Sequence, residues 1–172
     1  MVEVYQILWV TLYVLYTGPT QYRMRGERFV LDSMEGPVAF TAGINPLYVD
    51  NMDPKQTIIF ETTITDIGGG YNNSTGIFIA PRPGVYAFSC SLLDHYQNGL
   101  MLHAEIVKDN ASVLGRVFAH AEQDQYRDQG AQTVVTHLNA GDQVWVRIWD
   151  SKNLSLGGQL YSTFTGFLLY AD

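Results

Sequence analysis

The stretch FIAPRPGVYAFSC, residues 78–90, decides the fold class of this chain. Pro81 and Pro83 fix φ and offer no N–H to a ladder, so they predict a corner outside a sheet, and Gly84 lets the chain turn back in. Beyond the corner large and small side chains alternate, and the large ones are Tyr86, Phe88, Cys90 and Leu92. A period of two predicts a central β-strand with its large side chains in the core. The small side chains permit close approach by a second layer or another subunit.

The rest of the chain shows the same kind of signal. The β-rich runs lie at 37–44, 57–65, 76–80, 84–93, 100–108, 112–121, 131–138, 143–149 and 159–170. Turn signals separate them: Asn98-Gly99 is the strongest, and Asp109-Asn110, NAGD at 139–142 and Gly157-Gly158 are similar. No window predicts a helix of three turns. Strands of this length with short connections predict an all-β sandwich, and eight or more favour a jelly roll.

Composition narrows the range of partners. The chain has 172 residues, a net charge of −7 and only 10 basic residues, which argues against nucleic acid and against anionic membranes. Acidic loops could instead hold a hard cation such as calcium. Charged residues are 16% of the chain and tyrosines number 11. A surface poor in charge and rich in tyrosine suggests contacts beyond those of a lone monomer.

The N-terminal segment differs from the rest. VYQILWVTLYVLY, residues 4–16, is uncharged and too short to span a bilayer comfortably, so we expect a signal peptide at 1–20 and no membrane insertion. A mis-assigned start codon or an extra strand would explain it as well. Residues 21–36 show neither heptads nor a Gly-X-Y repeat, and we expect a linker there. The globular domain is expected at 37–172.

Several separated motifs carry a family resemblance. The key residues, in order, are Phe60, Asp66, Tyr71, Phe78, Gly84, Tyr86 and Phe88. Their spacing resembles that of the C1q domain, the globular head of complement and adiponectin-like proteins. GPVAFTA, GDQVWV and STFTGFLLY resemble its first, penultimate and closing regions, so the resemblance covers about 37–171. Cys90 departs from the pattern, which usually has an aromatic at that position.

This resemblance implies a ten-stranded jelly roll shared with tumour necrosis factor-like proteins. It also implies a secreted homotrimer, here a stand-alone member of the invertebrate type without a collagen stalk. A closed threefold assembly buries a flank of each subunit, which would account for the low charge and the many tyrosines.

The acidic cluster EQDQYRDQG, residues 122–130, resembles a loop that lines a calcium site in some family members. Asp124 and Asp128 would be ligands, and Gln125 would supply a carbonyl oxygen. The spacer between the two aspartates is shorter than in adiponectin-like members. A solvated polar loop is the alternative.

Catalytic signals are absent from the sequence. Cys90 has no disulfide partner and is predicted to be a buried thiol rather than a nucleophile. The four histidines lack metal-site spacing, and there is no G-x-S-x-G elbow. We therefore expect no enzyme.

Short sequence motifs predict glycosylation sites, and aromatic residues near strand ends suggest sugar binding. Asn73, Asn110 and Asn153 begin N-x-S/T triplets and are predicted glycosylation sites; the adjacent Asn72 also begins one. Four aromatic residues near predicted strand ends could stack on sugars: Tyr96, Tyr126, Trp149 and Tyr161. Trimer packing or a core position is the alternative for each of them.

Two functions remain open at this point. The first is a lectin-like pattern-recognition module of innate immunity that holds carbohydrate or microbial surface ligands by avidity. It rests on analogy at the level of the fold. The second is an extracellular signalling or structural trimer that binds a protein receptor or matrix. Free sugars would inhibit binding in the first case only.

Overall fold

The computed structural model describes residues 36–95, 99–109, 112–123 and 127–172. The chain divides into two units, 1–36 and 37–172, and the account below concerns the second. The predicted signal peptide at 1–20 and the linker at 21–36, apart from Gly36, lie outside the described residues.

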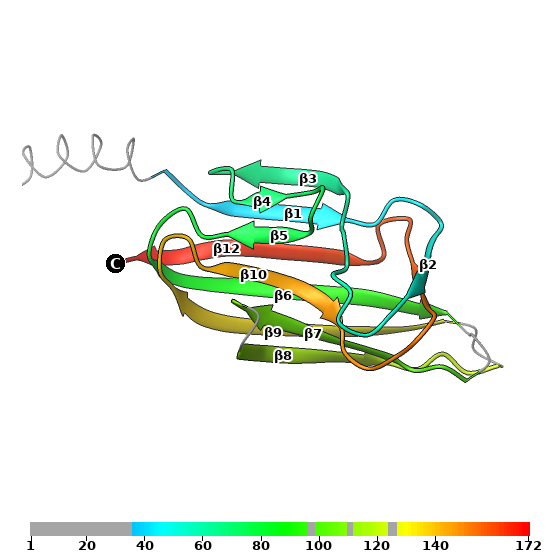
Figure 1. The fold of residues 1–172 in the computed structure, drawn as a ribbon. Helices are drawn as coiled ribbons and strands as arrows, with labels where there is room; N and C mark the ends of the chain where they lie inside the picture. The colour runs from blue at the N-terminus through cyan, green and yellow to red at the C-terminus, as the bar shows by residue number, and fades with distance from the viewer. Residues whose placement is uncertain (1–35, 96–98, 110–111, 124–126) are drawn as a thin grey trace, which may run out of the picture. The chain divides into compact units, whose positions relative to one another are not determined.

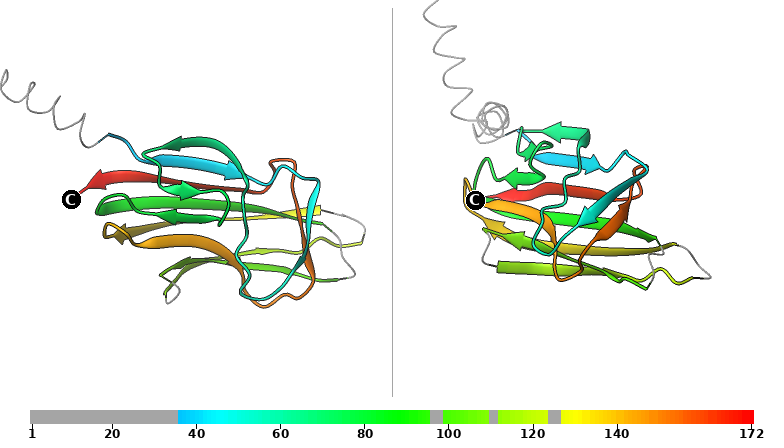
Figure 2. Two further views of the ribbon diagram at one scale, coloured as in Figure 1. Left: turned by 45° about the horizontal axis from the view of Figure 1, so that its top comes forward. Right: turned by 45° about the vertical axis from the view of Figure 1, so that its right-hand side comes forward.

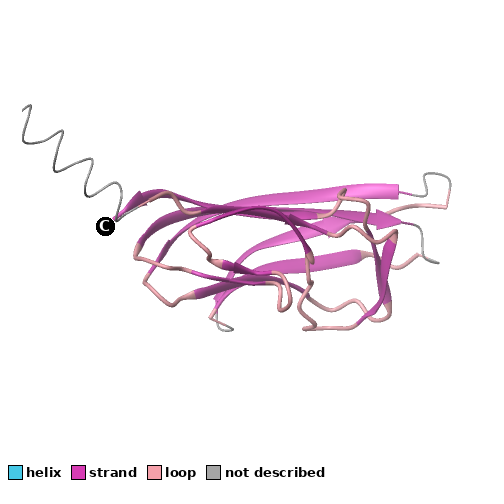
Figure 3. Ribbon diagram, turned by 90° about the horizontal axis from the view of Figure 1, so that it is seen from above, coloured by secondary structure: helices cyan, strands magenta, loops and turns pink. Residues whose placement is uncertain are grey.

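The described residues form two β-sheets and no helix (Figure 3). Twelve strands are present in this part of the chain: β1 (Ala39–Gly43), β2 (Tyr48–Met52), β3 (Thr62–Ile67), β4 (Tyr71–Asn72), β5 (Ile77–Ile79), β6 (Gly84–His95), β7 (Leu102–Lys108), β8 (Ser112–Ala119), β9 (Arg127–Leu138), β10 (Gln143–Ile148), β11 (Leu154–Gly157) and β12 (Thr163–Ala171). The all-β prediction is confirmed. Short edge pieces raise the number of strands from the expected ten to twelve.

The two sheets stack as the layers of a sandwich (Figures 1 and 2). The seven-stranded sheet has the order β2-β11-β6-β12-β1-β3, with β9 paired to the other side of β6. The five-stranded sheet has the order β4-β5-β10-β7-β8. β8 lies beside β9, so the two sheets approach each other along this side. A Cβ on Gly130 would lie 2.2 Å from the carbonyl oxygen of Phe118, so this approach requires glycine.

The predicted central strand is β6. It pairs with β9 along its whole length, and β12 and β11 follow one another along its opposite side. The Pro81–Pro83 corner precedes it, and Tyr86 donates a hydrogen bond of 2.8 Å from its hydroxyl to the Arg82 carbonyl. Gly84 has φ +152°, and a Cβ there would lie 2.5 Å from the Tyr170 carbonyl oxygen. The corner therefore starts the strand abruptly.

The predicted face of β6 fills the core. Tyr86, Phe88, Cys90 and Leu92 are all fully buried. Burial raises the pKa of the Cys90 thiol, so it remains protonated, as expected of a packed apolar side chain. Rings from both sheets surround this face, including those of Phe40, Phe60, Phe78 and Phe164.

Some expected boundaries were wrong. The strand expected at 57–65 begins at Thr62, and the one expected at 159–170 begins at Thr163. The short strands β2 and β11 were not expected. They pair with each other at an edge, where Asp50 and Asn51 interrupt any apolar alternation. Such pairings depend on a distant partner rather than on local pattern.

Candidate functional site

The acidic loop is shorter than the sequence suggested. Asp124 and Gln125 lie outside the described residues, and residues 127–130 belong to β9 rather than to a loop. Asp128 is therefore a strand residue. Its Oδ2 accepts a hydrogen bond from the His120 backbone N–H and its Oδ1 one from the Gln129 backbone N–H, both at 2.9 Å. No three metal-binding side chains of the described residues gather into a cation site. The calcium assignment stays a prediction.

A buried aspartate that sequence reasoning missed lies beside Asp128. Asp94 stands directly opposite it on β6 and is fully buried. Its Oδ2 accepts a hydrogen bond of 2.8 Å from the Ala121 backbone N–H, but Oδ1 has no partner among the described residues. Burial raises the pKa of this carboxyl. Asp94 directly follows Leu92 and Leu93, and this position at the end of an apolar run is the sequence signal that could have marked it.

The four predicted sugar-stacking aromatics do not form one group among the described residues. Tyr96 and Tyr126 lie outside the described part of the chain. Tyr161 is half exposed in the turn before β12, where its carbonyl accepts a hydrogen bond of 3.0 Å from Gln129. Trp149 follows β10, on the other sheet. Whether either of them stacks on a sugar remains a prediction.

Trp149 belongs to a cluster of aromatic and charged side chains on the five-stranded sheet. The Arg116 guanidinium lies 4.2 Å from the centre of its ring, and His103 lies 5.5 Å away, between Trp149 and the exposed Phe118. We call this cluster the Arg116 patch; it comprises Lys55, His103, Glu105, Arg116, Phe118, Arg147, Trp149 and Asp150.

A buried carboxylate organises the charged half of the Arg116 patch. The Glu105 side chain is 1% exposed, and its Oε1 accepts hydrogen bonds from Lys55 at 3.0 Å and from Arg147 Nε at 2.8 Å. Burial alone would raise the pKa of Glu105, but these hydrogen bonds and positive charges outweigh it and hold the pKa below its ordinary value. The carboxylate therefore stays ionised at neutral pH.

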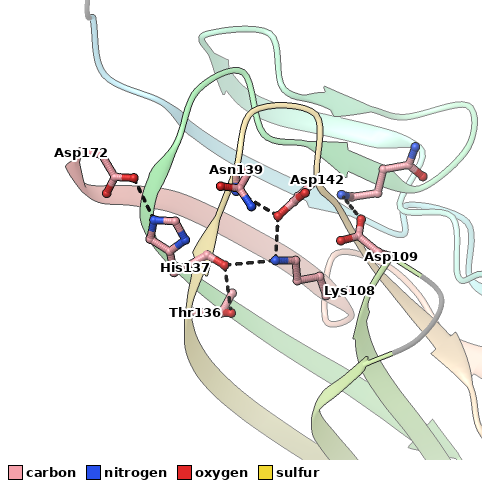
Figure 4. A network of polar contacts seen from close by, with 8 residues as sticks. Lys108, Asp109, Thr136, His137, Asn139, Asp142 and Asp172 are labelled. Carbon is pink, nitrogen blue, oxygen red and sulfur yellow. Dashed lines mark hydrogen bonds and ion pairs between the residues drawn. The ribbon is translucent and has the colours of Figure 1, made fainter.

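A second polar network stabilises the turn at 139–142 (Figure 4). Lys108 forms an ion pair of 2.6 Å with Asp142 and donates a hydrogen bond of 3.3 Å to the His137 carbonyl. The hydrogen bond from Lys108, joined by one from the Asn139 backbone, lowers the pKa of Asp142. His137 Nε2 lies 2.8 Å from Asp172 Oδ2. These contacts connect β7, β9 and Asp172, and they give the network a structural role.

The outer face of the seven-stranded sheet carries two rows of uncharged residues across β1, β12, β6 and β9. The first row consists of hydroxyl side chains: Thr41, Thr165, Ser89 and Thr133. The second row consists of apolar ones: Ala39, Phe167, Ala87 and Val135. We call these two rows the outer face. Val135 is 61% exposed and Phe167 41%, so large apolar area meets solvent there.

The predicted glycosylation sites that can be placed lie at exposed turns. Asn73 lies between β4 and β5 and donates a hydrogen bond of 3.2 Å to the Glu61 carbonyl. Asn153 lies before β11 with φ +55°. Asn110 lies outside the described residues.

Comparison with known proteins identifies the family. The C1q domain pattern matches residues 39–169, most of the chain. The chain belongs to the C1q-domain family. The resemblance read from Phe60, Gly84 and Phe88 is thereby confirmed.

Solved structures share the same fold. The globular domain of zebrafish complement 1qA is 23% identical, with a TM-score of 0.60, and the match covers 78% of this chain and 99% of that one. Eiger TNF from S. frugiperda is 14% identical, with a TM-score of 0.63 and coverage of 79% and 94%. Murine APRIL is 13% identical, with a TM-score of 0.61 and coverage of 77% and 99%. The predicted jelly roll of the C1q and tumour necrosis factor type is confirmed.

Membership of the C1q-domain family indicates the general class of function. C1q domains are non-enzymatic ligand-binding modules that typically form trimers, and C1q-domain proteins are typically secreted. In the part of the chain that the structure describes, no helix has the length and apolar character to span a membrane.

Proposed function

We propose that this chain is a secreted C1q-domain protein that assembles as a homotrimer and recognises carbohydrate or microbial surface ligands. The segment at 1–20 would direct its export. Three equivalent weak sites on one trimer would act together, since linked sites gain about 10²–10⁴ in apparent affinity without any new contact. This is a lectin-like pattern-recognition function of the kind that innate immunity uses.

The observation that carries the proposal is the outer face. Its hydroxyl row is already paired within the sheet: Thr41 bonds to Thr165, and Thr133 donates to Ser89, both at 3.1 Å. Because these hydroxyl groups already hydrogen-bond to one another, they lose few hydrogen bonds to water when a partner subunit buries them. The adjacent apolar row, with Phe167 and Val135, exposes apolar side chains of the kind that a permanent interface buries. Neither row contains a charge. A second and a third copy of the chain are the occupants that suit such a face.

Assembly is tested by a charge on the outer face. Phe167→Arg is expected to convert a trimer into monomers at micromolar concentration, because a buried unpaired charge is strongly unfavourable in an interface. Sedimentation equilibrium measures the change. Ile79→Arg is the matched control, since Ile79 is 45% exposed on the five-stranded sheet. A wild-type chain that sediments as a monomer would contradict the proposal.

Calcium is proposed as a cofactor near the join of β6 and β9. The residues present suit a hard cation: the Asp94 Oδ1 is buried without a described partner, and Asp128 stands opposite. Asp124 and Gln125 would complete the ligand set from the adjoining segment. A bound cation would hold Asp94 ionised despite its burial.

Binding is tested on a glycan array with the full-length chain, in calcium and in chelator. We expect retention of a subset of glycans by the trimer, inhibition by the corresponding free sugars and loss in chelator. If chelator changes neither binding nor the melting temperature, the calcium proposal is wrong. If no glycan is retained in either condition, the carbohydrate proposal is wrong.

A signalling or structural trimer is the second candidate. The fold likeness to Eiger TNF and murine APRIL favours it, because those jelly rolls are related in shape to this one. It predicts binding to a protein receptor or matrix that free sugars do not inhibit.

A further inference from the structure

The Arg116 patch is built from two rows that cross three strands of the five-stranded sheet. In the charged row, Glu105 on β7 faces Arg116 on β8 and Arg147 on β10. In the aromatic row, His103 on β7 faces Phe118 on β8, and Trp149 hydrogen-bonds to the His103 carbonyl through its backbone N–H at 2.9 Å. Successive outward residues lie about 6.6 Å apart along a strand, so charges and rings are neighbours.

Arg116 differs from the other cations of this patch. Lys55 and Arg147 both donate hydrogen bonds to Glu105. The Arg116 Nε lies 3.7 Å from Glu105 Oε2, which is too long for a hydrogen bond, and Arg116 donates no hydrogen bond to any described residue. Its side chain is 52% exposed. The guanidinium thus lies over Trp149 in a half-exposed side chain, and its N–H donors have no hydrogen-bond partner among the described residues.

Such an arrangement suits an incoming carboxylate. A guanidinium presents a planar fork of donors that matches a carboxylate bidentately, and stacking on an aromatic ring fixes its plane in advance. Ligand binding normally costs free energy because it immobilises a flexible side chain. The contact with Trp149 already restricts the Arg116 side chain, so this cost is smaller here. The geometry therefore provides a prepared anion-binding group.

The charge of the patch is opposite to that of the chain. Lys55, Arg116 and Arg147 supply three positive charges against the negative charges of Glu105 and Asp150, so the patch is positive with neutral His103. The whole chain carries −7. A single anionic group is attracted here, whereas a nucleic acid needs a longer run of cations than three.

Asp150 and Phe118, the other exposed groups of the patch, favour a sugar over other anionic ligands. Asp150 is 51% exposed; its Oδ1 lies 2.9 Å from His103 Nδ1, and a carboxylate is an acceptor for hydroxyl donors. Phe118 is 55% exposed and offers an apolar ring beside these polar groups. A sugar acid combines a carboxylate, hydroxyl donors and an apolar C–H face. Asp150 and Phe118 both contact His103, whose ring lies 5.5 Å from that of Trp149, so all of these groups belong to one small region of the sheet.

We propose that the Arg116 patch binds a saccharide that carries a carboxylate, with Arg116 holding the carboxylate, Asp150 accepting from a hydroxyl and Phe118 packing against the ring. This inference rests on the proposed carbohydrate-binding function and names its ligand class. The patch lies on the five-stranded sheet and the outer face on the seven-stranded sheet, so assembly through the outer face uses other residues.

The test compares acidic and neutral sugars on the same carrier. Polyacrylamide bearing β-glucuronic acid, α-N-acetylneuraminic acid or β-glucose at equal density is immobilised, and binding of the full-length chain is measured by surface plasmon resonance. We expect tighter binding to at least one acidic carrier than to the glucose carrier. The two acidic arms distinguish a uronic acid from a sialic acid as the source of the carboxylate.

Three substitutions test whether the Arg116 patch is responsible for binding to the acidic carriers. Arg116→Gln is expected to weaken binding to the acidic carrier about tenfold, the loss of one charge-assisted bidentate contact. Arg116→Lys keeps the charge without the planar fork and should recover only part of the affinity. Lys152→Gln removes one exposed positive charge from the turn after Asp150 and should change affinity less than about twofold, since screened surface charges contribute little.

The outcomes separate the two proposals. Retention of acidic carriers that Arg116→Gln leaves unchanged overturns the patch and leaves carbohydrate binding intact. Equal binding to the glucose carrier and the acidic carriers does the same. Failure of the assembled trimer to bind any carrier, together with an empty glycan array, overturns both.

Discussion

Phe40→Ala lowers the free energy of unfolding by about 3–5 kcal/mol, the usual cost of deleting a buried ring. We expect this because Phe40 is 1% exposed and lies at the centre of the aromatic core. Its ring stacks on Tyr71 at 4.6 Å and on Phe78 at 5.1 Å, and it meets Phe164 edge-on at 5.1 Å. These rings come from both sheets, so the cavity would lie where the two layers join. A loss of this size is a large share of a typical domain's stability.

Chemical denaturation at a fixed protomer concentration measures this loss, because assembly would otherwise add a concentration term. Ile64→Ala is the control: Ile64 is 55% exposed on β3, and its truncation should change stability by less than about 0.5 kcal/mol. A cost below about 1 kcal/mol for Phe40→Ala would mean that the ring does not hold the sheets together.

Glu105→Ala is expected to cost about 3 kcal/mol at pH 7, at the lower end of the range for breaking a buried ion pair. The reason is that Arg147, whose side chain is 13% exposed, loses its carboxylate partner, whereas Lys55 and Arg116 can turn toward water. Glu105→Gln keeps the shape and one acceptor oxygen, so it should cost less. Thermal and urea unfolding of both variants against the wild type measure the difference.

The cost of Glu105→Gln should depend on pH. The pKa of Glu105 is lower in the folded state than its ordinary value, so its ionised form stabilises the protein above the unfolded pKa of about 4.3. This stabilisation disappears as the pH falls through the folded pKa. The difference between wild type and Glu105→Gln should therefore be full at pH 7 and shrink below about pH 4. A difference that stays constant down to pH 3 would show that packing, not charge, makes Glu105 important.

The core face of β6 was predictable because side-chain direction alternates along a strand whatever its partners are. The alternation predicts that Tyr86 and Phe88 face the core, and both are fully buried in the structure. The edge pair β2 and β11 was not predicted, since β2 has no apolar alternation of its own and β11 is only four residues long. The start of β9 at Arg127 was missed for a related reason: acidic and amide residues suggest a loop until a long partner such as β6 is present to pair with them.

The candidate sites were predicted less well than the fold. Trp149 was singled out as a sugar-binding ring, but sequence reasoning missed Arg116, which covers it. Asp128 was expected as a calcium ligand, yet the buried Asp94 opposite it went unnoticed. In both cases the missing neighbour lies on another strand, more than thirty residues away along the chain. One sequence by itself holds no record of such pairs.

The order of apolar, small and turn residues along the chain was enough to determine an all-β sandwich, its central strand and its family, because these properties depend on local period and on motif spacing. Tertiary structure alone decided which strands became neighbours. It placed the Glu105 carboxylate between Arg116 and Arg147, and it set hydroxyl and apolar rows side by side on the outer face. Sheet pairing joins residues that are distant in the chain, and the register of that pairing is set by the packing of the whole core.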